Sequence, residues 1–402
     1  MPTTRSRKHW IRVWMIIGFI TLALGEIAAR VLQAPSPENS MPTFLRQPLL
    51  PFRPEVSTVR QSLEAAARYT YVVPDDELGW VVAKNGKYNV AYQSNAQGVR
   101  APANRVYTTV PPPGKVRIVA VGDSFTHCDE VNNDETWEVA LEGLRSDLEV
   151  LNLGVPGFGT DQALMRYRRD GVRFRPHISI LEIWTENICR NLNLVRYYLN
   201  PLSSPLNKPR FLLAEGKLKL INSPVMPREV LAQMLSQPEA FPLLQYEYWY
   251  DPAETAPHLY LHSALLRTAL SIRAQYRRKT RREKLYSNSD PAGIAVTVAI
   301  AKQFAKEAEA ARSKPIILLI PMLHHLEERR LYATEDAFPL GRALRSEHLE
   351  VIDLGLELAQ DTALDLDRLW IPQRHLTPAG NLRLAQELET RLRPWIAEAK
   401  GR

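Results

Sequence analysis

The chain has 402 residues, of which 45% are hydrophobic and 24% are charged, an ordinary composition for a folded protein. A wholly disordered chain is therefore excluded. The formal net charge is +7, and the 30 prolines indicate long proline-containing loops. Two cysteines are too few for a disulfide-rich scaffold or for a zinc site built from cysteine ligands.

The first segment is predicted to cross a membrane. Residues 1–9 are basic, and residues 10–32 are mainly apolar and long enough to span a bilayer. Glu26 and Arg30 interrupt this segment, but they lie four residues apart and can pair on one helix face. Because basic residues stay inside, we predict a signal anchor with everything after Leu32 exported. A cleaved signal peptide is the alternative, because Ala23-Leu24-Gly25 resembles a cleavage site.

The remainder is predicted to contain a linker, a short lead-in and one large domain. Residues 33–68 are rich in proline and polar residues, which is typical of a linker. Residues 69–113 contain short strand-like runs separated by turn signals such as Asn85-Gly86. Residues 114–398 then alternate apolar strands with amphipathic helices, a pattern typical of a parallel sheet covered on both faces.

Five strands are expected in the large domain. They lie at Val116–Val121, Val150–Val155, His177–Trp184, Pro315–Pro321 and Glu350–Leu354, and the main helices are expected at Glu135–Leu148, Asp161–Gly171, Ile294–Ala311 and Pro378–Trp395. The pattern breaks at residues 195–291, which are too many for an ordinary loop, so we expect a large insertion after the third strand.

Part of this insertion is strongly basic. Between Arg267 and Lys284 there are eight basic residues and one acid, Glu283, so this stretch alone carries the net charge of the whole chain. A solvated helix face would explain it. Contact with an anionic polysaccharide or membrane surface is the alternative, and nucleic acid is not expected as a partner of an exported chain without a recognisable binding module.

Polar residues with a common chemistry follow the strands of this domain. Ser124 stands on a tight turn after the first strand, and Gly157 lies in a glycine-rich loop after the second. Asn187 follows the third strand, and His375 precedes the last helix, for which Thr377 is a suitable N-cap. The carboxyl ends of parallel strands form one rim. A serine nucleophile, oxyanion donors and a histidine on that rim are typical of acyl transfer.

These residues resemble the motifs of the SGNH/GDSL hydrolase family. The matching segments are GDSFT (122–126), NLGVPGFG (152–159), the asparagine of TEN (185–187) and HLTPAG (375–380). DELGW (76–80) and QGVR (97–100) also look like membrane-anchored bacterial members associated with exopolysaccharide. The resemblance implies a flavodoxin-like three-layer α/β sandwich with a five-stranded parallel sheet. It also implies Ser124 as nucleophile, His375 as base, and the Ser124 amide, the Gly157 amide and the Asn187 side chain as oxyanion donors.

The chain departs from the family at the triad acid. The family places an aspartate two or three residues before the histidine, where this chain has Gln373 and Pro372. A triad acid orients the imidazole and stabilises its charged form, so its loss can slow catalysis by orders of magnitude. Asp365 or Asp367 could substitute from upstream, and a backbone carbonyl could also orient the ring.

The two cysteines fall beside the expected site. Cys128 follows Ser124 by four residues and Cys189 follows Asn187 by two. If the fold is as the resemblance implies, both occupy neighbouring loops, and an exported chain could join them in a disulfide. Two reduced, buried cysteines are the alternative.

Three functions are compatible with these features. The first is a serine esterase, a deacetylase of an O-acylated extracellular polysaccharide, and the second is an O-acyltransferase that uses the same site. The third is a non-catalytic glycan-binding or assembly component that has lost the triad acid. The resemblance implies no cofactor or metal, an acylated polysaccharide or another ester as partner, and a single-pass location in a bacterial cell membrane with the C-terminal domain periplasmic or extracellular.

Overall fold

The computed structural model describes residues 4–36, 41–89, 91–332, 338–361, 363–372 and 375–401. The chain forms two compact units. The larger unit comprises Ala65–Leu194, Asn207–Met226 and Arg282–Arg402, and the smaller comprises Met1–Glu64, Val195–Leu206 and Pro227–Arg281. The large insertion is therefore shared between both units.

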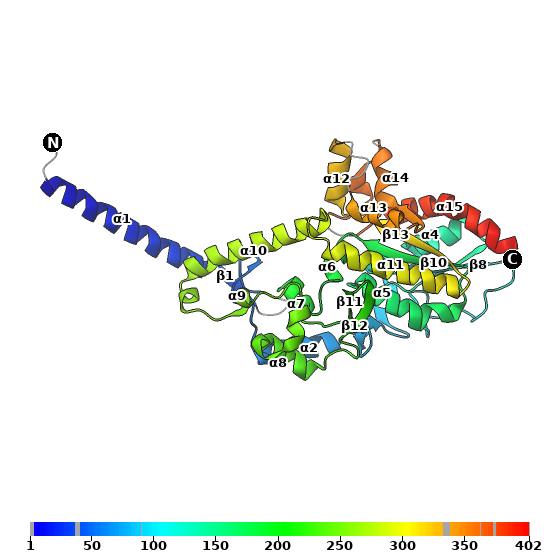
Figure 1. The fold of residues 1–402 in the computed structure, drawn as a ribbon, viewed down its shortest axis with the longest axis horizontal. Coiled ribbons are helices and arrows are strands. Elements are labelled where there is room, and N and C mark those ends of the chain that lie inside the picture. Colours follow the sequence, from blue (N-terminus) through cyan, green and yellow to red (C-terminus); the bar gives the residue numbers. More distant parts are fainter. Residues whose placement is uncertain are drawn as a thin grey trace. The chain divides into compact units, whose positions relative to one another are not determined.

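The larger unit is built on a five-stranded parallel sheet (Figure 1). Its strands are β8 (Val116–Val121), β9 (Leu148–Asn152), β10 (Ile178–Trp184), β13 (Lys314–Ile320) and β14 (Val351–Asp353). They lie in the order β14-β13-β10-β8-β9. This is the doubly wound order of flavodoxin-like folds, which places a topological switch point beside the first strand, β8. The predicted fold class is confirmed.

Helices cover both faces of the sheet. The alternate residues Ile118 and Ala120 of β8 belong to a core that also contains Trp137 of α4 (Trp137–Leu144) and Leu384 of α15 (Pro378–Gly401). The opposite face is covered by α5 (Thr160–Arg166) and α11 (Ala292–Ala310), which contact each other and the central strands. The strands are apolar on both sides because both sides are buried.

The lead-in consists of short hairpins, as the turn signals predicted. One hairpin pairs β4 (Val72–Asp75) with β5 (Gly79–Val82), and a shorter one pairs β6 (Lys87–Tyr88) with β7 (Tyr92–Gln93). Both belong to the larger unit. The same unit contains one hairpin of the insertion, formed by β11 (Arg210–Ala214) and β12 (Lys217–Ile221).

Much of the segment predicted as a linker is folded, so that prediction was wrong. Residues 33–68 contain β1 (Gln33–Pro35), β2 (Pro42–Phe44), β3 (Gln47–Pro48) and the helix α2 (Val56–Ala67). The reason is that apolar side chains stand between the prolines. Phe52 is fully buried, and its backbone amide donates to the carbonyl of Glu254 at 2.8 Å. The guanidinium of Arg278, from α10 (Ala264–Tyr286), lies over its ring at 4.8 Å.

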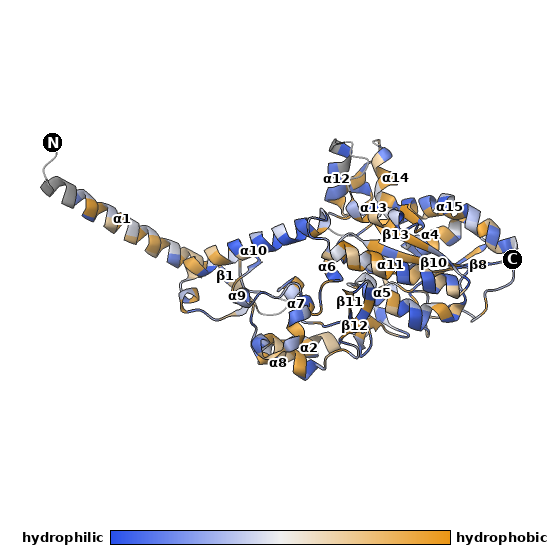
Figure 2. Cartoon of the chain, in the orientation of Figure 1, coloured by the Kyte–Doolittle hydropathy of each residue, from blue (hydrophilic) through white to orange (hydrophobic). Residues whose placement is uncertain are grey.

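The N-terminal helix α1 (Thr4–Val31) is mainly apolar after its basic first turns, on the side that Figure 2 shows. Its segment His9–Val31 is long and apolar enough to span a membrane, and most of its residues are exposed. Near its end, Glu26 and Arg30 form the predicted i,i+4 ion pair at 2.7 Å.

Candidate active site

Ser124 begins the one-turn helix α3 (Ser124–His127) directly after β8. The side chain of Asp123 caps this turn by accepting from the amide of Phe125 at 2.8 Å. Gly122 is needed before it, because a Cβ there would lie 2.3 Å from a carboxylate oxygen of Glu182. This tight turn leaves Ser124 only 4% exposed at the carboxyl end of the sheet.

His375 lies in the loop before α15 and faces the serine. Its Nε2 is 2.8 Å from Ser124 Oγ. Thr377 caps the helix as the sequence indicates, since its Oγ1 accepts from the amide of Gly380 at 3.1 Å. The ring of Phe125 packs on the imidazole with 5.0 Å between centroids. The structure therefore brings the predicted nucleophile and base into hydrogen-bonding contact.

The carboxylate nearest to the other imidazole nitrogen was not predicted. Glu130 Oε2 lies 3.5 Å from His375 Nδ1. Its backbone has a φ of +72°, in the left-handed region, and the Tyr92 hydroxyl accepts from its amide. This conformation turns the chain after α3 back towards the histidine. Sequence reasoning passed over the adjacent acids Asp129 and Glu130, which follow Ser124 closely.

The two aspartates proposed as substitutes are engaged elsewhere. Asp365 accepts from the amide of Asp367 at 3.1 Å and pairs with Arg368 at 3.3 Å, and both aspartates are exposed. Neither is brought to His375 in the part of the chain that the structure describes. Gln373 lies outside the described residues.

Asn187 has the properties required of an oxyanion donor. It starts the short helix α6 (Asn187–Arg190) after β10 and is 1% exposed. Its side-chain Nδ2 has no hydrogen-bond partner among the described residues. A buried amide group without a partner is costly unless a ligand completes it. Gly157, in the loop after β9, has a φ of +78° that favours glycine.

One arginine joins the three loops of this site. Arg190 Nη1 donates to Asp123 at 2.9 Å after β8, to the carbonyl of Phe158 at 2.9 Å after β9, and to Asn187 Oδ1 at 3.4 Å after β10. The contact with Oδ1 also fixes which end of the Asn187 amide remains free to donate. Sequence reasoning missed Arg190, although its position three residues after Asn187 on a helix was a usable signal.

Glu182, a buried acid on β10, supports the turn that carries Ser124. Glu182 Oε2 on β10 accepts from the amide of Asp123 at 3.0 Å and from Thr126 Oγ1 at 3.1 Å. Burial, reinforced by the nearby Asp123 carboxylate, raises the pKa of Glu182 well above its usual range. Through its two hydrogen bonds, Glu182 acts as a structural bridge between β10 and the turn.

His127 lies behind the site in a separate network. Its Nδ1 is 2.5 Å from Asp129 Oδ1 and its Nε2 is 2.7 Å from the hydroxyl of Tyr71. Complete burial and the charge of Arg100 lower the pKa of His127 to about 4. This histidine is neutral near pH 7 and fully buried, and its hydrogen bonds brace the loop that carries Glu130.

The possible disulfide between Cys128 and Cys189 is not formed, and both cysteines are buried as reduced thiols. Cys128 belongs to the core on the α4 side, where its sulfur lies 3.5 Å from Glu138 Oε2. Cys189 is surrounded instead by Glu186, Arg282 and Tyr286. Both cysteines follow strands that end at the same edge of the sheet, but their side chains lie beside different residues.

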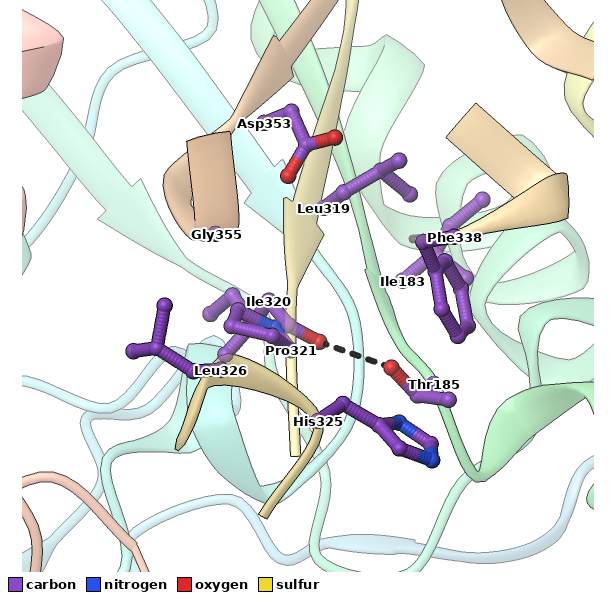
Figure 3. Close-up of a pocket in the computed structure, with 10 residues that line it drawn as sticks. All are labelled: Ile183, Thr185, Leu319, Ile320, Pro321, His325, Leu326, Phe338, Asp353 and Gly355. Atoms are coloured by element: carbon purple, nitrogen blue, oxygen red, sulfur yellow. Dashed lines mark hydrogen bonds between the residues drawn. The ribbon is translucent and has the colours of Figure 1, made fainter. Parts of the chain in front are cut away.

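A small apolar pocket lies at the ends of β10 and β13 (Figure 3). Thr185 Oγ1 donates to the carbonyl of Ile320 at 3.5 Å, and both residues line the pocket together with His325. Its volume of 20 Å³ admits about one water molecule. This pocket is too small to hold a sugar ring or an acyl chain, so the candidate site remains the cluster around Ser124.

Comparison with known proteins finds similarity at the level of solved structures. No protein family profile matches the chain, and no curated protein sequence matches it. One solved structure that matches is a lipolytic protein of the G-D-S-L family from Desulfitobacterium hafniense. It has 13% identity and a TM-score of 0.34, and the match covers 69% of this chain and 99% of that one.

Acetylxylan esterases are also among the matching structures. A catalytic mutant of the enzyme from Geobacillus stearothermophilus has 12% identity and a TM-score of 0.36, over 70% of this chain and 95% of that one. A second acetylxylan esterase has 10% identity and a TM-score of 0.36, over 69% of this chain and its own full length, 100%.

Proposed function

We propose that the chain is a serine esterase in which Ser124 is the nucleophile. The observation that carries this proposal is the 2.8 Å contact between His375 Nε2 and Ser124 Oγ, next to an Asn187 amide that is buried and unpartnered. Acyl transfer requires a nucleophile that is hydrogen-bonded to a base, and an unpartnered hydrogen-bond donor on an adjacent loop.

In the proposed reaction, His375 Nε2 takes the hydroxyl proton as Ser124 Oγ attacks the ester carbonyl. The oxyanion accepts hydrogen bonds from Asn187 Nδ2 and from the amides of Ser124 and Gly157. The carbon–oxygen bond to the alcohol then breaks, and the alcohol leaves with the proton from His375. Water, activated by the same imidazole, attacks the acyl-enzyme and releases the carboxylic acid.

Glu130 is proposed to complete this machinery as a positioning residue. Its carboxylate faces His375 Nδ1, where it can hold the ring and stabilise the imidazolium that forms during attack. The distance of 3.5 Å and the one-quarter exposure of the Glu130 side chain describe a looser contact than a short buried carboxylate–imidazole bond.

The substrate is proposed to be an O-acylated extracellular polysaccharide, with α1 as a membrane anchor. Support for the location comes from the length and apolar character of His9–Val31 and from the basic residues before it. The polysaccharide itself rests on the sequence resemblance to bacterial proteins associated with exopolysaccharide. The acetylxylan esterases among the matching structures are named for substrates of this kind.

Labelling by a serine-directed fluorophosphonate tests the proposal. We expect the full-length chain in detergent to be labelled, and Ser124→Ala to remove both labelling and acetate release from 4-nitrophenyl acetate and acetylated xylan. His375→Ala should lower acetate release by about 10³-fold or more. Labelling that is equal in wild type and Ser124→Ala would contradict the assignment. If the acyl group appears on an added oligosaccharide instead of as free acetate, the enzyme is a transferase.

A further inference from the structure

The turn before α10 is fastened to the end of the apolar helix α1. The carboxylate of Glu26 accepts from Ser263 Oγ at 2.8 Å and from the amides of Ala264 and Leu265 at 2.8 and 2.9 Å. It therefore serves as an N-cap for α10, although it comes from a distant part of the sequence. Arg30 Nη2 donates to the carbonyl of His262 at 2.9 Å.

Apolar packing accompanies these polar contacts. A Cβ placed on Gly25 would lie 3.3 Å from a methyl group of Leu265, so Leu265 packs directly on the helix at Gly25. Leu265 and its neighbours consequently occupy the same level along α1 as the stretch from Gly25 to Arg30. All these residues belong to the smaller unit.

That level corresponds to one edge of the bilayer if α1 spans a membrane as proposed. The apolar segment has 23 residues, which at about 1.5 Å per residue gives about 34 Å, slightly more than a hydrocarbon core of about 30 Å. The basic end and Trp10 then lie at the inner interface. Gly25 to Arg30 lie at the outer one, where charged side chains reach the headgroups.

Large apolar side chains are exposed next to these contacts, beside the exposed imidazoles of His258 and His262. The turn η6 (Leu259–His262) exposes 86% of Leu259, more than any other large hydrophobic residue in the described part of the chain. Tyr260 is 46% exposed, and Leu266 in the first turn of α10 is 43% exposed. Exposed leucines are costly in water and favourable in lipid, and tyrosine is enriched at membrane interfaces.

We propose that residues 258–266 form a lipid-contacting loop that inserts Leu259 and Tyr260 into the outer interface of the bilayer beside α1. The occupant of this surface is lipid because the surface continues directly from the membrane-spanning helix through Glu26 and Arg30. The inference rests on the proposed membrane anchor, and it does not depend on the esterase activity.

Site-directed spin labelling of the full-length chain in phosphatidylcholine–phosphatidylglycerol vesicles tests this proposal. Cys128 and Cys189 are buried, so a nitroxide can be attached selectively to Leu259→Cys under native conditions. We expect this label to collide more readily with oxygen, which dissolves in lipid, than with a water-soluble nickel chelate. Leu22→Cys on α1 is the lipid control, and Val106→Cys in the lead-in is the water control; both native side chains are more than half exposed, at 62% and 68%.

The controls separate the possible failures. If Leu22→Cys reports lipid while Leu259→Cys reports water, the loop proposal is wrong and the anchor stands. If Leu22→Cys also reports water, the anchor and the loop proposal both fail. A Leu259→Cys label that reports water and is immobilised by acetylated xylan would assign this surface to glycan and overturn the proposal. Fluorophosphonate labelling of the same samples tests the esterase independently.

Discussion

The contact between Glu130 and His375 is proposed to replace the acid of a motif position that this chain lacks. A sequence motif shows an acid only when acid and histidine are close in the chain, and here they come from opposite ends of the domain. The chain brings Glu130 into position by ending α3 with Cys128 and Glu130 both at positive φ, which reverses its direction within three residues. A motif search cannot detect this reversal.

Replacing Glu130 tests its role as a positioning residue. We expect Glu130→Gln to lower kcat by about 10- to 100-fold, less than the loss reported for a tightly bonded triad acid, because the contact is longer and partly solvated. The measurement is kcat for 4-nitrophenyl acetate as a function of pH, compared between wild type and Glu130→Gln.

The matched control is Asp365→Asn, which alters an exposed acid that sequence reasoning had suggested for the same role. This variant should keep the wild-type kcat and pH profile. A larger loss in Asp365→Asn than in Glu130→Gln would reverse the assignment.

Asn187 offers a second test at the level of one side chain. Because its free Nδ2 is proposed to bind the developing oxyanion, we expect Asn187→Ala to lower kcat by about 10²- to 10³-fold with little change in KM. Fluorophosphonate labelling of Ser124 should become slower but remain detectable. An unchanged kcat would exclude Asn187 from the oxyanion site.

At the level of elements, the close approach of the β9 loop to α3 depends on Gly154. A Cβ at Gly154 would lie 2.2 Å from the amide nitrogen of His127, a backbone atom that cannot move aside. We expect Gly154→Ala to destabilise the protein by about 2–4 kcal/mol. Denaturant unfolding, followed by circular dichroism, gives the difference.

Gly143 provides the comparison within the same layer. A Cβ there meets nothing within 4 Å, and the residue lies in the helix α4. Gly143→Ala should therefore leave stability unchanged or raise it by up to about 1 kcal/mol. Equal losses from both substitutions would show that backbone proximity at Gly154 is unimportant.

The helix α4 also carries a buried acid that makes stability depend on pH. Burial raises the pKa of Glu138 to about 8. In the unfolded chain this carboxyl loses its proton near pH 4.3, so between these values unfolding releases a proton and stability falls as pH rises. We expect the free energy of unfolding of Glu138→Gln to exceed that of wild type by up to a few kcal/mol at pH 7–8. Near pH 4 the two proteins should be equally stable.

Unfolding free energies measured between pH 4 and 8 would check this. The informative quantity is the difference between Glu138→Gln and wild type at each pH, because other titrating groups such as His127 contribute equally to both proteins. A difference that does not change with pH would show that Glu138 is ionised in the folded protein.

The positions of the strands and of the site serine could be predicted from the sequence, because both leave strong local patterns. Val116–Val121 and β8 coincide, and the other strands start and end within three residues of their predicted positions. The folding of the segment around Phe52 could not be predicted, because its burial depends on partners such as Glu254 and Arg278 far away in the chain. Glu130 was missed for the same reason, because His375 is far away in the chain, whereas Arg190 was overlooked despite its position three residues after Asn187.

At the level of the whole molecule, the net charge is less exposed than the sequence suggested. The helix α10 contains all eight basic residues of the stretch Arg267–Lys284. Arg267 binds the carbonyl of Leu50, Arg278 pairs with Glu254 at 2.6 Å, and Arg282 pairs with Glu186. These three arginines hold the fold together, so only part of the stretch is a solvated basic face.

The burial of both cysteines predicts that their thiols react only after the chain unfolds. We expect the denatured, unreduced protein to react with two equivalents of a thiol reagent, and the native protein to react with none during the same period. Burial also raises the pKa of both thiols, which keeps them in the unreactive form. An absence of thiols after denaturation would establish the disulfide that the structure lacks.

The position of Arg190 has a consequence for how activity is gained during refolding. Its guanidinium holds loops that follow three successive strands, so no subset of the sheet can supply the complete proposed oxyanion site. Helical signal and hydrophobic collapse can recover while any one of these strands is still unpaired. Ester hydrolysis should therefore return only with the slowest step of tertiary assembly. The recovery of activity would then measure completion of the fold.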